Sequence, residues 1–239
     1  MSTTYYIASC TFTIYMNDLS IKIQDYVQKR FGMTVVRCCT PKFRVQHFTE
    51  CMPENYRPLW SALPESGSFQ PGDIICSPCH NCLNIISETH PEVRTISLWE
   101  LILSDSEFRF PDYSGLEATL QDCWRSRKNA AEQDAVRRIL EKMNIRWREI
   151  DDCREKADFC GLTLFQPQPP RNPALAPNYY AVDIEGKFLP HTREEQKQKM
   201  EEHCRQFTTD TVICYCQYCY KGLKIAARDA RYLGEMLFR

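Results

Sequence analysis

Hydrophobic and polar positions alternate along this chain in a way that predicts short strands followed by amphipathic helices. Residues 5–9 form a predicted strand that ends at a cysteine. A helix is predicted from the capping pair Asn17–Asp18 to Gly32, and residues 33–36 then form a β-branched strand. Strands and helices that alternate at this pitch predict an α/β fold with a largely parallel sheet.

The same order of elements recurs in the second half. Residues 116–120 form a predicted strand, a helix follows with Val136, Ile139 and Leu140 in its apolar stripe, and residues 145–150 alternate as a strand. The sequence therefore predicts two tandem, pseudo-symmetric Rossmann-like lobes with mostly parallel sheets.

Two aspartates set the register of this repeat. Asp73 precedes Cys79 by six positions (79 − 73), and Asp210 precedes Cys216 by six (216 − 210). A short apolar strand follows each aspartate, and a helix follows each Cys-x-x-Cys. Because ligands usually collect at the carboxyl ends of parallel strands, the cysteines that follow these strands are expected to converge there.

The domain boundary is predicted in the polar stretch 104–114, which gives domains of residues 1–108 and 109–239. The spacing from Cys39 to Cys79 is 40 positions, whereas Cys160 to Cys216 is 56. The excess includes a proline-rich insertion, residues 165–178, which predicts an irregular surface loop.

Composition excludes several classes of function. The formal net charge is −1, so no overall field would attract nucleic acid. No apolar stretch approaches the roughly 18–20 residues that span a bilayer. The first residues lack a basic region followed by an apolar run, so no signal peptide is predicted and a cytoplasmic protein is expected.

Fourteen cysteines are therefore the main chemical feature of the chain. In reducing cytosol such cysteines are more often metal-binding or catalytic than disulfide-bonded. A single cysteine, a paired position and a Cys-x-x-Cys occur in that order twice. The first set is Cys10, Cys38, Cys39, Cys79 and Cys82, and the second is Cys123, Cys160, Cys216 and Cys219.

Soft thiolates favour iron–sulfur clusters, zinc and Cu(I). Zinc needs only four cysteines in a tetrahedral site, and the five of the first set exceed that number. The alternative for the unpaired cysteines Cys51, Cys153 and Cys204 is that they are small buried hydrophobes.

This arrangement resembles the cysteine-rich CCG-domain family, found in the cysteine-rich component of heterodisulfide reductase and in lactate-utilisation iron–sulfur proteins. The similarity spans nearly the whole chain as two tandem domains. It implies that all nine cysteines of the two sets are cofactor and metal ligands. The implied cofactor is a [4Fe–4S] cluster, of either the cubane or the non-cubane kind in the first domain. No separate catalytic side chain is assigned.

The chain departs from the family pattern at several positions. Thr40 replaces the glycine of the first Cys-Cys-Gly, and Phe159 replaces the first cysteine of the second. The second site therefore holds a four-thiolate cubane, recruits Cys153 or Cys214, or has lost its cluster.

The resemblance implies a heterodisulfide reductase-like oxidoreductase component that reduces a disulfide or related sulfur substrate at a cluster. The alternatives are an electron-relay component of a larger redox complex and a non-redox zinc-binding module. No ferredoxin-type cysteine run is present, so an electron-donor protein or partner subunit containing ferredoxin or flavin is expected, together with a small thiol or disulfide substrate.

Overall fold

Each half of the chain forms one four-stranded, entirely parallel sheet, which confirms the predicted α/β class. This computed structural model describes residues 2–239. The chain divides into unit 1, which runs to Leu98 and includes Phe238, and unit 2, which contains Trp99–Leu237 and Arg239. The strand orders β2-β1-β3-β4 and β6-β5-β7-β8 are the same order repeated.

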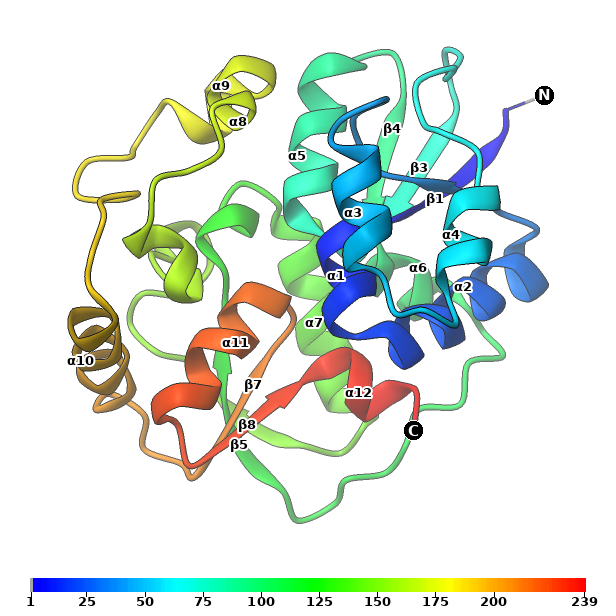
Figure 1. Ribbon diagram of the computed structural model, residues 1–239. Coiled ribbons are helices and arrows are strands. Elements are labelled where there is room, and N and C mark those ends of the chain that lie inside the picture. The colour runs from blue at the N-terminus through cyan, green and yellow to red at the C-terminus, as the bar shows by residue number, and fades with distance from the viewer. Residues whose placement is uncertain (1) are drawn as a thin grey trace. The chain divides into compact units, whose positions relative to one another are not determined.

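Unit 1 follows the predicted alternation of strands and helices (Figure 1). Its elements are β1 (Thr4–Ala8), α1 (Cys10–Tyr15), α2 (Asn17–Phe31), β2 (Thr34–Arg37), α3 (Val45–Cys51), α4 (Arg57–Ala62), β3 (Ile74–Ser77), α5 (His80–Thr89) and β4 (Arg94–Ser97).

Helix α2 begins one residue earlier than the predicted cap implies. Met16 is its N-cap residue, because α1 ends directly before it, and Asn17 is already helical. The helix ends as predicted at Gly32, which has a φ of +62°, and its backbone N–H bonds to the carbonyl of Gln28.

Unit 2 repeats the pattern with a longer connection between its second and third strands. Its elements are α6 (Leu98–Ser104), β5 (Glu117–Gln121), η1 (Trp124–Ser126), α7 (Ala130–Lys142), β6 (Arg146–Arg148), η2 (Arg154–Lys156), η3 (Gly161–Phe165), α8 (Arg171–Leu175), α9 (Pro177–Tyr180), α10 (Arg193–Cys204), β7 (Thr211–Cys214), α11 (Gln217–Ala226), β8 (Asp229–Tyr232) and α12 (Leu233–Leu237).

The division between the units lies ten residues before the boundary that we place at 108/109 (108 − 98). Trp99 explains this position, because its ring packs edge-on against Tyr215 and Tyr232 of unit 2, with centroid distances of 6.5 and 6.0 Å. Helix α6 therefore contributes a buried tryptophan to the core of the second unit.

The proline-rich connection is more ordered than an irregular loop. Helices α8 and α9 occupy part of it, and Pro177 is the first residue of α9. Proline is tolerated in the first turn of a helix because the N–H it lacks would have no partner there. Figure 1 shows these two short helices before the longer α10.

The strand order fixes where a ligand site can form in each unit. From β5 the chain crosses to β6 on one side of the sheet, whereas β7 lies on the other side of β5. Parallel crossovers are almost always right-handed, so α7 and α11 cover opposite faces of the sheet. The topological switch point, where ligands usually bind, therefore lies at the carboxyl ends of β5 and β7, and by the same reasoning at those of β1 and β3.

Within residues 2–239, no helix has both the length and the apolar character that crossing a bilayer requires.

Candidate metal centre

Four buried cysteines meet at the carboxyl edge of the unit 2 sheet. The metal-ligating atoms of Cys123, Cys160, Cys216 and Cys219 all lie within 4.8 Å of one another. The Sγ atoms of Cys123 and Cys160 are 3.4 Å apart. The structure thus brings together all four cysteines of the second predicted set.

Three of these sulfurs belong to residues that follow the carboxyl ends of β5 and β7. Cys123 follows β5 and caps η1, where its Sγ accepts from the backbone N–H of Arg125 at 3.4 Å. Cys216 is the N-cap residue of α11, and Cys219 lies in the first turn of that helix. The positive end of the helix dipole favours thiolate charge at these two positions.

The fourth sulfur depends on a tight turn at Gly161. This glycine has a φ of +58°, and a Cβ there would collide with the carbonyl oxygen of Tyr218 in α11. A Cβ at Gly222 of α11 would in turn lie 2.7 Å from the Cα of Gly161. The two glycines let the Cys160 turn sit directly on the helix that carries Cys219.

Arg125 supplies a buried positive charge at the sulfur group. Its Nη1 donates to the Sγ of Cys160 at 2.5 Å and to the Oγ1 of Thr163 at 2.8 Å. The sequence alone does not identify this residue, because an arginine beside a cysteine is ordinarily a solvated surface side chain.

The cation and the neighbouring thiols shift the ionisation of the cysteines. Burial by itself raises the pKa of Cys160, but the hydrogen bond from Cys123 and the charge of Arg125 contribute to lowering the pKa overall. Burial raises the pKa of Cys123 and of Cys219. Of these three thiols, Cys160 therefore ionises most readily.

Phe159 occupies the position where the first set has Cys38. Its ring stacks on the imidazole of His203, with centroids 3.9 Å apart and planes 8° from parallel. The Nε2 of His203 lies 2.6 Å from the Oε1 of Gln121, and burial lowers the pKa of this histidine to about 4. His203 is thus part of the site wall, not the ordinary surface residue that its sequence context suggests.

Neither proposed substitute for the missing cysteine joins the group of four. The Sγ of Cys153 donates to Glu149 at 3.4 Å in an exposed turn. The thiol of Cys214 is buried, but it bonds to the backbone carbonyls of Cys216 and Arg231.

Phe159 and His203 both line a cavity of about 430 Å³. Its wall includes Phe159, His203, Leu164, Lys187 and Lys199. The four cysteines do not line it, and Phe159, which does, directly precedes Cys160 in the chain.

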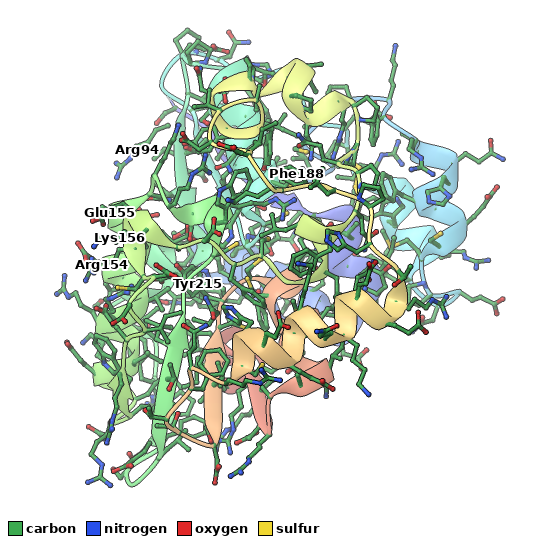
Figure 2. The ribbon with its side chains drawn as sticks, turned by 90° about the vertical axis from the view of Figure 1, so that its left-hand side faces the viewer. Arg94, Arg154, Glu155, Lys156, Phe188 and Tyr215 are labelled. Carbon is green, nitrogen blue, oxygen red and sulfur yellow. A yellow bond between two sulfur atoms is a disulfide. The ribbon has the colours of Figure 1, made fainter. Side chains whose placement is uncertain are left out.

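A buried ion pair anchors the segment that carries Cys123. Asp122 directly precedes Cys123 and accepts from Arg137 at 2.7 Å, from the hydroxyl of Tyr215 at 2.7 Å and from the backbone N–H of Arg154 at 2.8 Å. Tyr215, labelled in Figure 2, lies between Cys214 and Cys216 and so ties this network to the Cys-x-x-Cys segment.

The first set of cysteines adopts a different arrangement in unit 1. Cys10 and Cys38 form a disulfide, a pairing that the cysteine spacing does not predict. Cys39, Cys79 and Cys82 are buried free thiols, and Cys82 hydrogen-bonds with both of the others. Cys82 therefore links three free thiols of this set by hydrogen bonds.

The Cys-x-x-Cys of unit 1 matches its counterpart in unit 2. Cys79 is the N-cap residue of α5, and the backbone N–H of Cys82 donates to the Cys79 carbonyl at 3.0 Å. Hydrogen bonding from Cys82, with a smaller contribution from Ser9, lowers the pKa of Cys79 to about 6. Both units thus present a cysteine pair at the start of a helix.

Comparison of the chain with protein-family models and with curated proteins finds no match.

Proposed function

We propose that unit 2 binds a metal centre through Cys123, Cys160, Cys216 and Cys219, and that the protein is an iron–sulfur oxidoreductase component that acts on a disulfide or related sulfur substrate. The convergence of four buried sulfurs within 4.8 Å of one another supports the metal centre, and the cysteine spacing of the chain supports its assignment to iron–sulfur chemistry. Buried cysteines that serve only as small hydrophobes have no reason to meet at one point.

The chemistry of the donor set fits a metal–thiolate centre. Four soft sulfur ligands suit iron–sulfur clusters and zinc. Arg125 and the start of α11 supply positive charge beside ligands that become negative when they bind a metal. When bound, an iron–sulfur cluster would supply single-electron transfer.

The protein's own residues would position and shield such a centre. Gly161 lets the Cys160 turn approach α11, and Asp122 anchors the segment that carries Cys123. Phe159, next to Cys160 and on the wall of the cavity, would shield the centre from water. The cavity that Phe159 lines is large enough for a small thiol or disulfide, and we place the substrate there.

Zinc is a second candidate because the sulfurs are close together. A tetrahedral ion bonded to each sulfur at about 2.3 Å would hold the sulfurs about 3.8 Å apart, and those of Cys123 and Cys160 are 3.4 Å apart. A four-iron cluster is larger than one ion and requires these sulfurs to separate. A zinc-loaded protein would be a non-redox binding module.

Unit 1 is proposed as a second thiolate site when its disulfide is reduced. Reduction of the Cys10–Cys38 bond would return five thiols to the set, and Cys39→Ser should then remove first-site metal while the fold is retained. Full metal content in this variant would show that Cys39 is not a ligand.

We place the protein in the cytoplasm, since twelve of its cysteines are free thiols, which reducing compartments preserve.

Anaerobic purification followed by iron, acid-labile sulfide and zinc analysis tests the main proposal. Iron and sulfide in stoichiometric amounts are expected. Stoichiometric zinc without sulfide would reject the redox function and select the binding module.

A second experiment separates a catalyst from an electron relay that serves a partner protein. After oxidation, the paramagnetic signal of the loaded protein should change when a small thiol is added if the substrate reaches the centre. A signal that no thiol alters would assign the protein to electron relay between an electron-donor protein and a partner subunit.

A further inference from the structure

A buried cation stands in unit 2 where unit 1 has an apolar side chain. Arg125 follows Cys123 by two residues, as Phe12 follows Cys10. Arg125 is 4% exposed and Phe12 is 1% exposed. A guanidinium stays charged in proteins, and a charge that leaves water needs a compensating partner.

The sulfur group provides that partner. The Nη1 of Arg125 donates to Cys160, and its backbone N–H donates to the Sγ of Cys123. After burial, the largest electrostatic influence on Arg125 comes from Cys160. A thiol that coordinates a metal is deprotonated, so metal binding would place full negative charge directly against this guanidinium.

The connection between η3 and α10 encloses one side of Arg125. The guanidinium carbon lies 5.8 Å from the ring centroid of Tyr180, 6.0 Å from that of Phe188 and 5.4 Å from that of Tyr218. Tyr180 and Phe188 also pack on Trp124, at centroid distances of 6.1 and 5.5 Å. Phe188 lies on the segment between α9 and α10, as Figure 2 shows. The longer connection of unit 2 thus supplies two of the three rings around the cation.

The two cysteine sets consequently differ in charge when fully ionised. Once the Cys10–Cys38 disulfide is reduced, five thiolates in the first set carry −5, whereas four thiolates and Arg125 carry −3 (−4 + 1). One change comes from Phe159 in place of a cysteine, and the other from Arg125 in place of Phe12.

We propose that Arg125 is a positioning residue that holds Cys160 in place and neutralises part of the thiolate charge of the unit 2 centre, and that the connection between η3 and α10 keeps this cation out of water. This inference rests on the proposed metal-binding function. It gives the connection between η3 and α10 the role of burying Arg125. It also predicts that the bound metal centres of the two units differ in total charge.

Cobalt(II) binding tests the role of Arg125 without requiring activity. The full-length protein and its variants would be reduced and titrated anaerobically with Co²⁺ against a competing chelator, and the thiolate-to-cobalt absorption band would be followed. Arg125→Gln should weaken Co²⁺ binding in unit 2 by about 10–100-fold, the range found for residues that support metal ligands. Arg125→Lys should recover part of this affinity, because it retains the charge.

Arg127→Gln is the matched control. The Arg127 guanidinium lies 4.0 Å from the Trp124 ring centroid and donates to the Trp124 carbonyl at 3.0 Å. Arg127 is also buried, so its replacement measures the cost of removing a packed arginine that donates no hydrogen bond to the four sulfurs. Its Co²⁺ affinity should equal that of the unmodified protein.

Equal Co²⁺ affinity in folded Arg125→Gln and in the unmodified protein would overturn the inference and leave the proposed function standing. If Arg125→Gln does not fold, Thr163→Val tests the same contact with the charge retained. A several-fold weaker affinity in that variant supports the inference, and an unchanged affinity rejects it. If the unmodified protein binds no Co²⁺, the proposed metal function and this inference both fail.

Discussion

Units 1 and 2 have the same strand order and the same Cys-x-x-Cys placement at a helix start, yet four matched positions around their cysteines differ. Unit 1 has Ser9, Phe12, Cys38 and Thr40 where unit 2 has Asp122, Arg125, Phe159 and Gly161. The shared topology determines where the site forms. The substitutions determine its charge, the number of its sulfurs and how closely its elements pack.

The largest effects are expected when one cysteine of each site is replaced, which tests whether the two sites bind metal independently. Cys219→Ser should abolish metal binding in unit 2, because one of four converging ligands is lost, while leaving the content of unit 1 unchanged. Cys82→Ser should do the reverse. Native mass spectrometry of each variant, purified anaerobically, counts the bound centres. Loss of both centres in either variant would show that the two sites are coupled.

Asp122→Asn tests the buried ion pair at the position where unit 1 has Ser9. Asp122 is 0% exposed and its partner Arg137 is 4% exposed by side chain. Removing one partner of a buried pair costs about 3–5 kcal/mol of unfolding free energy, and chemical denaturation of the metal-free protein would measure this loss. Asp210→Asn, at an exposed pair with Arg228, should cost less than about 1 kcal/mol. Similar losses at the two positions would contradict the role of the Asp122 network.

Gly161→Ala tests the close approach of the Cys160 turn to α11. An alanine there would combine a strained left-handed backbone with a collision against the Tyr218 carbonyl, and we expect a loss of about 3 kcal/mol. Gly186 has a φ of +72° but no atom within 4 Å of a built Cβ. Gly186→Ala should therefore cost only about 1 kcal/mol, from backbone strain alone. Thermal unfolding of both variants measures the difference, and equal losses would exclude the collision as the cause.

His203 gives unit 2 a smaller, pH-dependent instability. Its pKa is lowered to about 4 by burial, from an ordinary value of 6.5, so the unfolded chain takes up the proton first. The stability associated with the neutral ring is present above pH 6.5 and is lost as the pH falls towards 4. The loss should amount to roughly 2–3 kcal/mol.

Unfolding of the metal-free protein between pH 4 and 8, compared with that of His203→Gln, isolates this contribution. The variant should lose less stability on acidification. At pH 8 the ring is unprotonated in both states, so a difference there measures the lost stacking on Phe159 and the lost contact with Gln121. Parallel pH profiles for the two proteins would show that His203 does not titrate as expected.

The main strands were predictable because their apolar residues are contiguous in sequence. Residues 5–9 and 116–120 correspond to β1 and β5 within one residue at each end. The edge strands β4 and β8 were missed, since Arg94–Ser97 and Asp229–Tyr232 contain charged residues and little alternation. Pairing with a buried neighbouring strand, not their own hydrophobicity, makes these segments extended.

The residues that support the unit 2 site left no local signal. Asp122 meets Tyr215 across 93 positions of sequence, and the rings around Arg125 come from three separate segments. The sequence does not distinguish a charged residue that is buried from one that is exposed to solvent. Only the fold reveals which charged side chains have left water.

The sequence by itself determined the main alternation of strands and helices, the duplication and the spacing of the two cysteine sets, because each of these depends on periodicity and short-range spacing. The tertiary structure decided which sulfurs meet, which pair is bonded and which charges accompany them. Those outcomes depend on contacts between segments tens of residues apart. In unit 2 those contacts bring four sulfurs and one guanidinium to a single point at the edge of a parallel sheet.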